Sequence, residues 1–118
     1  MKDSIICEGA HIEADLVQNS ILGPRTVIKQ GALIKNTYVI GNDFYSPPVQ
    51  NSKIPDKLQI GENCIIDHAI IDKHVCLGKG VQLVNKKKLT HYNSEHVYIR
   101  DGIIIVSRGA NIPDGFIL

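Results

Sequence analysis

The chain has 118 residues, which is enough for one compact domain. Thirteen Lys and Arg residues against 12 Asp and Glu residues leave a formal net charge of +1, which argues against general binding to nucleic acid or to an anionic membrane. No apolar run reaches the roughly 18 residues that a membrane span requires. Three scattered cysteines, Cys7, Cys64 and Cys76, suit neither a disulfide framework nor a CxxC metal site, so we expect a reducing compartment.

Branched aliphatic residues dominate the apolar part of the chain. Isoleucine occurs 19 times and valine nine times, whereas there are two Phe residues, one Met and no Trp. β-Branched side chains are favoured in strands and lose rotamer freedom in helices. No segment has apolar residues at the helical spacing i, i+3, i+4, i+7. The composition therefore predicts a mostly β fold with an aliphatic core.

An aliphatic residue recurs every five or six positions through most of the chain. The repeat runs over residues 5–41, resumes over 60–84 and returns over 103–118. The residues expected to face inward are Ile6, Ile12, Val17, Leu22, Ile28, Ile34, Ile40, Ile60, Ile66, Ile71, Leu77, Leu83, Val106, Ile112 and Leu118. A period of six corresponds to a short strand plus a tight corner, and three such units close a triangular coil of about 18 residues.

Stacked coils of this kind pair their strands in parallel, so each face of the prism becomes a sheet. Gly9, Gly31, Gly80 and Gly109 stand where corners with unusual φ are expected, each just before a small inward residue. An ordinary β-sandwich would show hairpin signals every 8–12 residues, and such signals are scarce here. We predict one all-β domain over residues 1–118, a single-stranded left-handed β-helix of hexapeptide repeats with two loop insertions.

The two insertions interrupt the period at residues 42–59 and 85–102. The first holds three of the five prolines, and the second holds the run Lys86–Lys88 together with His91 and His96. Insertions of this length in a repeat fold usually carry function or contact a partner.

Several segments, in order, are similar to the C-terminal domain of glucose-1-phosphate adenylyltransferase (ADP-glucose pyrophosphorylase). The segments that carry the similarity are residues 3–6, 20–25, 40–45, 60–78, 98–106 and 110–115. Tyr98-Ile99-Arg100-Asp101-Gly102-Ile103-Ile104 is the most specific of them, because most of it lies outside the hexapeptide repeat. The resemblance covers essentially all 118 residues and is strongest to the plant and cyanobacterial type.

The resemblance implies part of a two-domain enzyme that makes ADP-glucose and pyrophosphate from ATP and glucose 1-phosphate, for glycogen or starch synthesis. In the family, the N-terminal nucleotidyltransferase domain carries a Gly-rich phosphate loop and acidic residues that hold magnesium. Neither motif occurs here, so we expect no catalytic residue, metal or cofactor in this chain and no activity from it alone. The implied partners are that N-terminal domain, further subunits of a homo- or hetero-tetramer and a phosphorylated metabolite effector. The implied location is the cytoplasm, or the plastid stroma in a plant or alga.

Positive charge is concentrated between residues 73 and 100, where six Lys and Arg residues accompany a single acid. Phosphate esters are bound well by such clusters. The resemblance assigns an effector contact to Arg100 and, more loosely, to Arg25, and the local charge adds Lys86 and Lys87. One departure from the plant-like pattern is Asp67, which replaces a Lys and would repel a phosphate.

A second interpretation is a hexapeptide-repeat acyltransferase that uses acyl-CoA, because this class shares the architecture. His91 or His96 would then be the catalytic base, and the lysine run would face the CoA phosphates. A scaffold without a ligand is a third possibility. No cysteine near His91 and His96 completes a zinc set, and Cys64 is expected to be a small core residue.

Overall fold

The computed structural model describes residues 4–43 and 58–118, so most of the first insertion and its prolines lie outside the described residues. The described ranges contain fifteen short strands and no helix, hence no helix long and apolar enough to cross a membrane. The strands are β1 (Ile5–Ile6), β2 (His11–Ile12), β3 (Leu16–Gln18), β4 (Ile21–Leu22), β5 (Val27–Ile28), β6 (Leu33–Lys35), β7 (Tyr38–Val39), β8 (Ile65–Asp67), β9 (Ala69–Ile71), β10 (Cys76–Leu77), β11 (Gln82–Leu83), β12 (His91–Asn93), β13 (Val97–Arg100), β14 (Ile103–Val106) and β15 (Asn111–Ile112).

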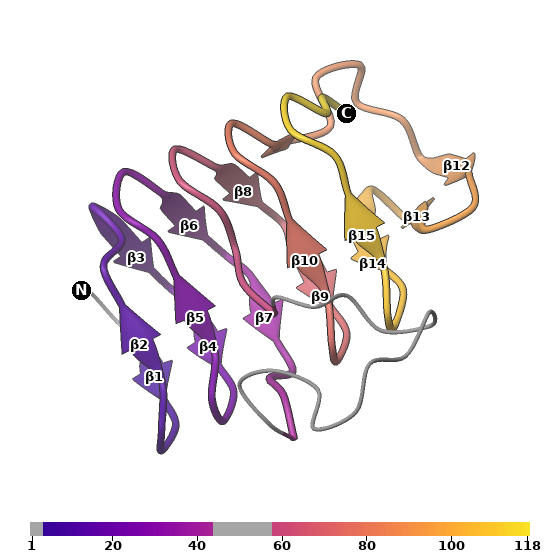
Figure 1. Cartoon of the computed structure of the whole chain (residues 1–118). Helices are drawn as coiled ribbons and strands as arrows, with labels where there is room; N and C mark the ends of the chain where they lie inside the picture. The colour runs from indigo at the N-terminus through magenta and orange to yellow at the C-terminus, as the bar shows by residue number, and fades with distance from the viewer. Residues whose placement is uncertain (1–3, 44–57) are drawn as a thin grey trace.

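These strands form stacked coils with three faces (Figure 1). One face is a seven-stranded sheet in the order β1-β4-β7-β9-β14-β13-β12, and another is a four-stranded sheet in the order β11-β8-β6-β3. The third face consists of the pairs β2-β5 and β10-β15, which single bridges through Ile60 connect. Every pair between successive coils is parallel. The predicted all-β parallel helix is confirmed.

The inward aliphatic residues stack in three columns inside the prism. Most of them are at most 5 % exposed, as in the columns Val17-Ile34-Ile66-Leu83, Leu22-Val39-Ile71-Val106 and Ile28-Ile60-Leu77-Ile112. Burial of apolar surface stabilises by about 25 cal/mol per Å², so these columns are the main source of stability. Ile6 and Ile12 of the first coil are only half-buried.

The coil is shorter than predicted, because paired strands such as Leu16↔Leu33 lie 17 residues apart. As a result Val39, and not Ile40, faces the core: Val39 is 5 % exposed and Ile40 is half-buried. The coil is shorter by one residue because one of its three corners contains one residue fewer. We call this corner the short corner. Its residues are Asn19, Asn36, His68 and Asn85, with φ of 52°, 49°, 53° and 54°. Asn and His enter this left-handed region more readily than most residues, and the corner then closes with one residue fewer.

Glycines at the other corners behave as predicted. Gly9, Gly31, Gly80 and Gly109 have φ between 68° and 82°. At Gly31 the coils also approach closely, since a Cβ there would lie 2.1 Å from Oδ1 of Asn63. A glycine is therefore required at position 31, because the backbone has a positive φ and because a Cβ would have no room beside Asn63.

The second insertion, expected as a loop, contains a β-hairpin. β12 pairs antiparallel with β13, and β13 pairs antiparallel with β14. Asp101 and Gly102 join β13 to β14 with φ of 53° and 79°, as a two-residue turn between twisted strands requires. Val97 and Ile99 on β13 are 1 % and 0 % exposed, so the hairpin extends the core beyond the last coil.

The outer face of the seven-stranded sheet carries aligned apolar residues, which we call the apolar ladder. Register places Ile5, Ile21, Tyr38, Ile70 and Ile105 beside one another on successive strands. Ile5 is 61 % exposed, Ile21 37 % and Tyr38 47 %. A contiguous exposed stripe of this kind is typical of a surface that contacts a partner.

Candidate functional site

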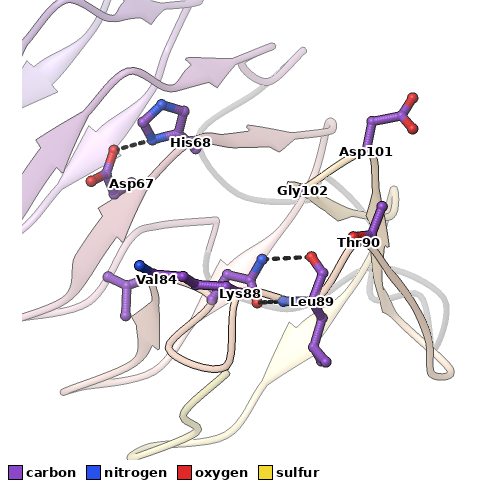
Figure 2. A pocket seen from close by; sticks show the side chains of 9 residues that line it. Asp67, His68, Val84, Lys88, Leu89, Thr90, Asp101 and Gly102 are labelled. Carbon is purple, nitrogen blue, oxygen red and sulfur yellow. Dashed lines mark hydrogen bonds and ion pairs between the residues drawn. The ribbon is translucent and has the colours of Figure 1, made fainter.

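An open groove of about 520 Å³ lies where the second insertion passes the short corner. We call it the corner groove. Figure 2 shows Asp67 and His68 on one wall, Lys88 and Leu89 on the opposite wall, and the Asp101–Gly102 turn at one end. Val84, Asn85 and Thr90 complete the lining. The groove is thus formed by segments that are distant in the sequence.

The first wall is fixed by hydrogen bonds along the short corner. Asp67 ends β8, and its Oδ1 accepts a hydrogen bond from Asn36 Nδ2 at 3.0 Å. His68 Nδ1 lies 2.7 Å from the same oxygen, and Asn19 Nδ2 donates to Asn36 Oδ1 at 2.8 Å. This row of polar side chains holds Asp67 and His68 in place although both are accessible to solvent, with side-chain exposures of 37 % and 67 %.

The second wall is a compact turn of the chain. Asn85 Nδ2 donates to the Leu89 carbonyl at 2.9 Å, and the Leu89 amide donates to Asn85 Oδ1 at 2.8 Å. The Lys88 amide also donates to the Asn85 carbonyl at 2.9 Å. These three bonds close the turn and leave the exposed Lys88 side chain along the groove (Figure 2).

The groove offers mixed charges to a ligand. Lys88 supplies one cationic group, whereas Asp67 lies in the wall and Asp101 at the rim. Carboxylates and the Thr90 hydroxyl accept hydrogen bonds from hydroxyl groups, and an ammonium binds a phosphate or carboxylate. The arrangement suits a hydroxyl-rich ligand with one anionic group better than it suits a compact polyanion.

A second polar cluster lies at another corner of the prism. His74 is 3 % exposed, and its Nε2 lies 3.3 Å from Oδ2 of Asp43, whose Oδ1 accepts a hydrogen bond from Lys73 Nζ at 3.1 Å. Burial lowers the pKa of His74 despite the nearby Asp43, and the hydrogen bond from Lys73 lowers the pKa of Asp43. Arg25 lies at the same corner, where its Nε donates to the Asn42 carbonyl at 2.7 Å. This cluster links the coils on either side of the first insertion.

A family model of the GLGC left-handed parallel β-helix domain matches residues 1–117. The chain belongs to this family. It corresponds to the C-terminal domain of glucose-1-phosphate adenylyltransferase, so the resemblance expected from the sequence is confirmed. The fold is accordingly the left-handed form of the parallel β-helix.

The effector residues expected in this adenylyltransferase domain lie at separate places. Arg25 follows β4, at the corner where the parallel strands of the large sheet end. Arg100 pairs with Ile103, at the opposite end of those strands, and β7, β9 and β14 separate it from β4. Lys86 and Lys87 are exposed at the tip of the Asn85–Leu89 turn. Their roles remain predictions, and they do not form one pocket.

Arg100 is engaged by the hairpin itself. Its guanidinium donates to the Tyr92 carbonyl at 3.0 Å, to the Ile99 carbonyl at 2.9 Å and to Asn93 Oδ1 at 2.6 Å, and it lies 5.5 Å from the centre of the Tyr98 ring. A phosphate that binds Arg100 must share or replace these bonds. The structure thus gives Arg100 a role in fixing the hairpin, in addition to the effector role expected.

The histidines of the alternative acyltransferase reading are both on the hairpin. His91 is exposed at the start of β12, and His96 precedes β13 with its Nε2 3.6 Å from Glu95 Oε1. In residues 4–43 and 58–118 no three His, Cys, Asp or Glu side chains are gathered so as to hold a metal ion. Cys64 is a buried core residue as predicted, and burial raises the pKa of its thiol.

Asp67 could be singled out from the sequence, whereas the groove around it could not. The opposite wall includes one residue of the run of three lysines, because only Lys88 lines the groove. The sequence does not show which of the three lysines has this place. Asp101-Gly102 between alternating apolar residues is a hairpin signal, and it could have indicated the turn between β13 and β14, although not its place beside the short corner.

Proposed function

We propose that this chain is the assembly and regulatory domain of a glucose-1-phosphate adenylyltransferase, which makes ADP-glucose and pyrophosphate from ATP and glucose 1-phosphate. On this proposal, the reaction and its magnesium belong to an N-terminal nucleotidyltransferase domain, in the cytoplasm or the plastid stroma. The product would serve glycogen or starch synthesis. Membership of the GLGC β-helix family supports the proposal.

The observation that carries the assembly role is the apolar ladder. Ile5, Ile21 and Tyr38 expose apolar surface in one line, next to Ile70 and Ile105. Covering such a stripe releases ordered water and contributes about 25 cal/mol per Å² of apolar area. The catalytic domain or a neighbouring subunit would supply the covering surface.

Regulation is the finer part of the proposal, and the corner groove supports it. Lys88 would bind the phosphate of an effector, while the Asp67 carboxylate and the Thr90 hydroxyl would bind its hydroxyl groups. A sugar phosphate matches this set better than a small polyanion, because Asp67 repels additional negative charge. Arg100 would join the site only after releasing one of its hairpin bonds.

Assembly is tested by placing charges on the ladder. The double variant Ile21→Glu/Tyr38→Glu of the full enzyme should weaken subunit association at least tenfold, because buried unpaired carboxylates oppose the interface. Sedimentation velocity across a dilution series measures this. The matched control is His11→Glu/Asn111→Glu, two exposed outward positions on the third face. Equal association of both variants and the wild type would contradict the assembly role.

The effector role is tested by activation of the same full enzyme. Lys88→Gln should raise the sugar phosphate concentration needed for half-maximal activation at least fivefold, and Arg100→Ala should raise it less. Lys79→Gln is the control, because Lys79 is exposed at a different corner. If the Lys88→Gln and Lys79→Gln enzymes need the same sugar phosphate concentration for half-maximal activation, the corner groove is not the effector site.

A further inference from the structure

A hollow of about 320 Å³ lies on the outer side of the seven-stranded sheet, beside the short corner. We call it the ladder hollow, because Ile21, Tyr38 and Ile70 of the apolar ladder form one of its walls. The buried residues Thr37 and Ala69 form its floor. Neighbouring strands of a sheet lie about 4.8 Å apart, so the wall crosses β4, β7 and β9 and the hollow follows the axis of the β-helix.

The ladder wall offers an apolar surface that includes an aromatic ring. Ile21 and Tyr38 are exposed, and Ile70 between β7 and β14 is half-buried. The exposed side chain of Ile103 adds apolar surface where the hollow meets β14. The face of a tyrosine ring carries partial negative charge and attracts C–H groups. A ligand with an apolar face that covers this wall therefore gains the free energy of apolar burial and a contact with the Tyr38 ring.

The opposite wall is polar, and it consists of Asn19, Asn36 and His68 from the short corner. Nδ2 of Asn19 donates to Asn36, and Nδ2 of Asn36 donates to Asp67. An amide NH₂ group has two N–H bonds, so in the described part of the chain each Asn keeps a second N–H for a ligand. Because the Asp67 carboxylate accepts from Nδ1 of His68, the Nε2 atom of a neutral ring is an acceptor. The wall thus presents donors and an acceptor that the row already holds in place, which lowers the entropy cost of binding.

The ladder hollow favours an uncharged ligand. Among the described residues, those that line it include no Asp, Glu, Lys or Arg. A phosphate or carboxylate would find no cation in this lining, and Asp67 next to His68 would repel it. The corner groove differs in this respect, since Lys88 lines it. The two spaces share His68 but select ligands of different charge.

We propose that the ladder hollow binds a neutral sugar, as a monosaccharide or as one or two rings of an oligosaccharide. A pyranose ring has an apolar C–H face, which packs on Tyr38, and hydroxyl groups around its rim, which bond to Asn19, Asn36 and His68. The volume is at the lower limit for small-molecule sites, which selects one or two rings. A nucleobase is a poorer match, because its polar groups lie in one plane whereas the polar wall presents groups from successive coils.

This site does not rest on the proposed function, although it touches the same surface. Ile21 and Tyr38 belong both to the ladder hollow and to the ladder on which we propose that a partner sits. A partner there would cover the hollow, so the sugar and the partner would compete. Binding is therefore measured on the chain alone, at a concentration where sedimentation shows a monomer.

Binding is tested by NMR titration of the chain with glucose, maltose and cellobiose, and with sorbitol and adenosine for comparison. We expect at least one of the three sugars to bind at least tenfold more tightly than sorbitol, whose open chain has no ring face, with amide shifts around Tyr38 and Ile70. Preference for maltose or cellobiose identifies an α- or a β-linked chain, and equal binding of glucose identifies a monosaccharide. Sugar binding no tighter than that of sorbitol or adenosine overturns the proposal, and so do shifts confined to Lys88 and Leu89.

Variants test each wall of the ladder hollow separately. Tyr38→Ala should weaken binding of the preferred sugar at least fivefold, whereas Tyr38→Phe keeps the ring and should stay within twofold of the wild type. Asn36→Gly should weaken it at least threefold, and the matched control Asn63→Gly, at an exposed residue of another corner, should leave it unchanged. Both Asn residues have positive φ, which glycine adopts without strain, and circular dichroism verifies the fold. Unchanged affinity in both Tyr38→Ala and Asn36→Gly overturns the proposal. The assay uses neither a phosphorylated effector nor enzyme activity, so its failure is distinct from failure of the proposed function.

Discussion

The two ends of the β-helix differ in whether described strands pair with their outer strand edges. At the first coil, no described strand pairs with the outer edges of β1, β2 and β3, and Ile6 and Ile12 are only half-buried. At the last coil, the β12–β13 hairpin covers the edge of β14 and buries Val97 and Ile99. Open strand edges invite pairing with another chain, and covered edges prevent it. Among the described residues, the β-helix thus has unpaired strand edges at its first coil and, at its last coil, an edge that its own insertion covers.

The largest expected effect is a cavity in the closed end. Ile99→Ala should lower the free energy of unfolding by about 3 kcal/mol, because Ile99 is fully buried between hairpin and core. Ile12→Ala at the open end should cost about 1 kcal/mol, since water already reaches that side chain. Urea denaturation followed by circular dichroism measures both values. Equal costs would mean that the two ends are equally well packed.

A substitution in the turn that joins β13 to β14 should have a smaller and more local effect on stability. Gly102 has φ of 79° and a Cβ there would meet no atom within 4 Å, so Gly102→Ala costs conformational energy alone, about 1 kcal/mol. Gly80→Ala is the matched change at an ordinary corner, with φ of 68° and equally open surroundings. Hydrogen exchange should speed up in β12 and β13 for the first variant only. Faster exchange there in both variants would show that the hairpin opens together with the coils.

The smallest expected effect is on the pH dependence of stability, and it comes from His74, which is buried in a coil between the two ends. The pKa of His74 is lowered from 6.5 by burial, so folding favours its neutral form. Stability should therefore be complete above about pH 6.5 and fall as the pH drops through the lower folded-state pKa. His74→Asn should flatten this dependence in thermal unfolding curves. Asp43 cannot cause it, because the lowered pKa of that carboxyl shifts its own loss of stability to below pH 3.8.

Most of the fold could be predicted, because a five- or six-residue aliphatic period over three segments has few structural solutions. The exception at Val39 and Ile40 has a physical cause. Both residues are apolar, so hydrophobicity alone does not decide which faces inward. The decision comes from Asn36, whose left-handed conformation shortens the corner by one residue.

The candidate site was less accessible to sequence reasoning. Charge density drew attention to Lys86, Lys87 and Arg100, but it says nothing about which side of a turn each side chain occupies. Arg100 was expected to contact an effector, and no sequence pattern indicated that the hairpin would also engage it through three hydrogen bonds. The corner groove depends on contacts between residues far apart in sequence, which no local pattern encodes.

His68 lines the corner groove, and it also lines a hollow of about 320 Å³ beside Tyr38 and Ile70 of the apolar ladder. One imidazole is therefore a shared wall between the hollow at the apolar ladder, where we propose that a subunit binds, and the corner groove, where we propose that an effector binds. A ligand that rotates the ring away from Asp67 alters both spaces at once. By thermodynamic reciprocity, a subunit seated on the ladder would then change the affinity of the groove by the same factor that the effector changes the affinity of the subunit.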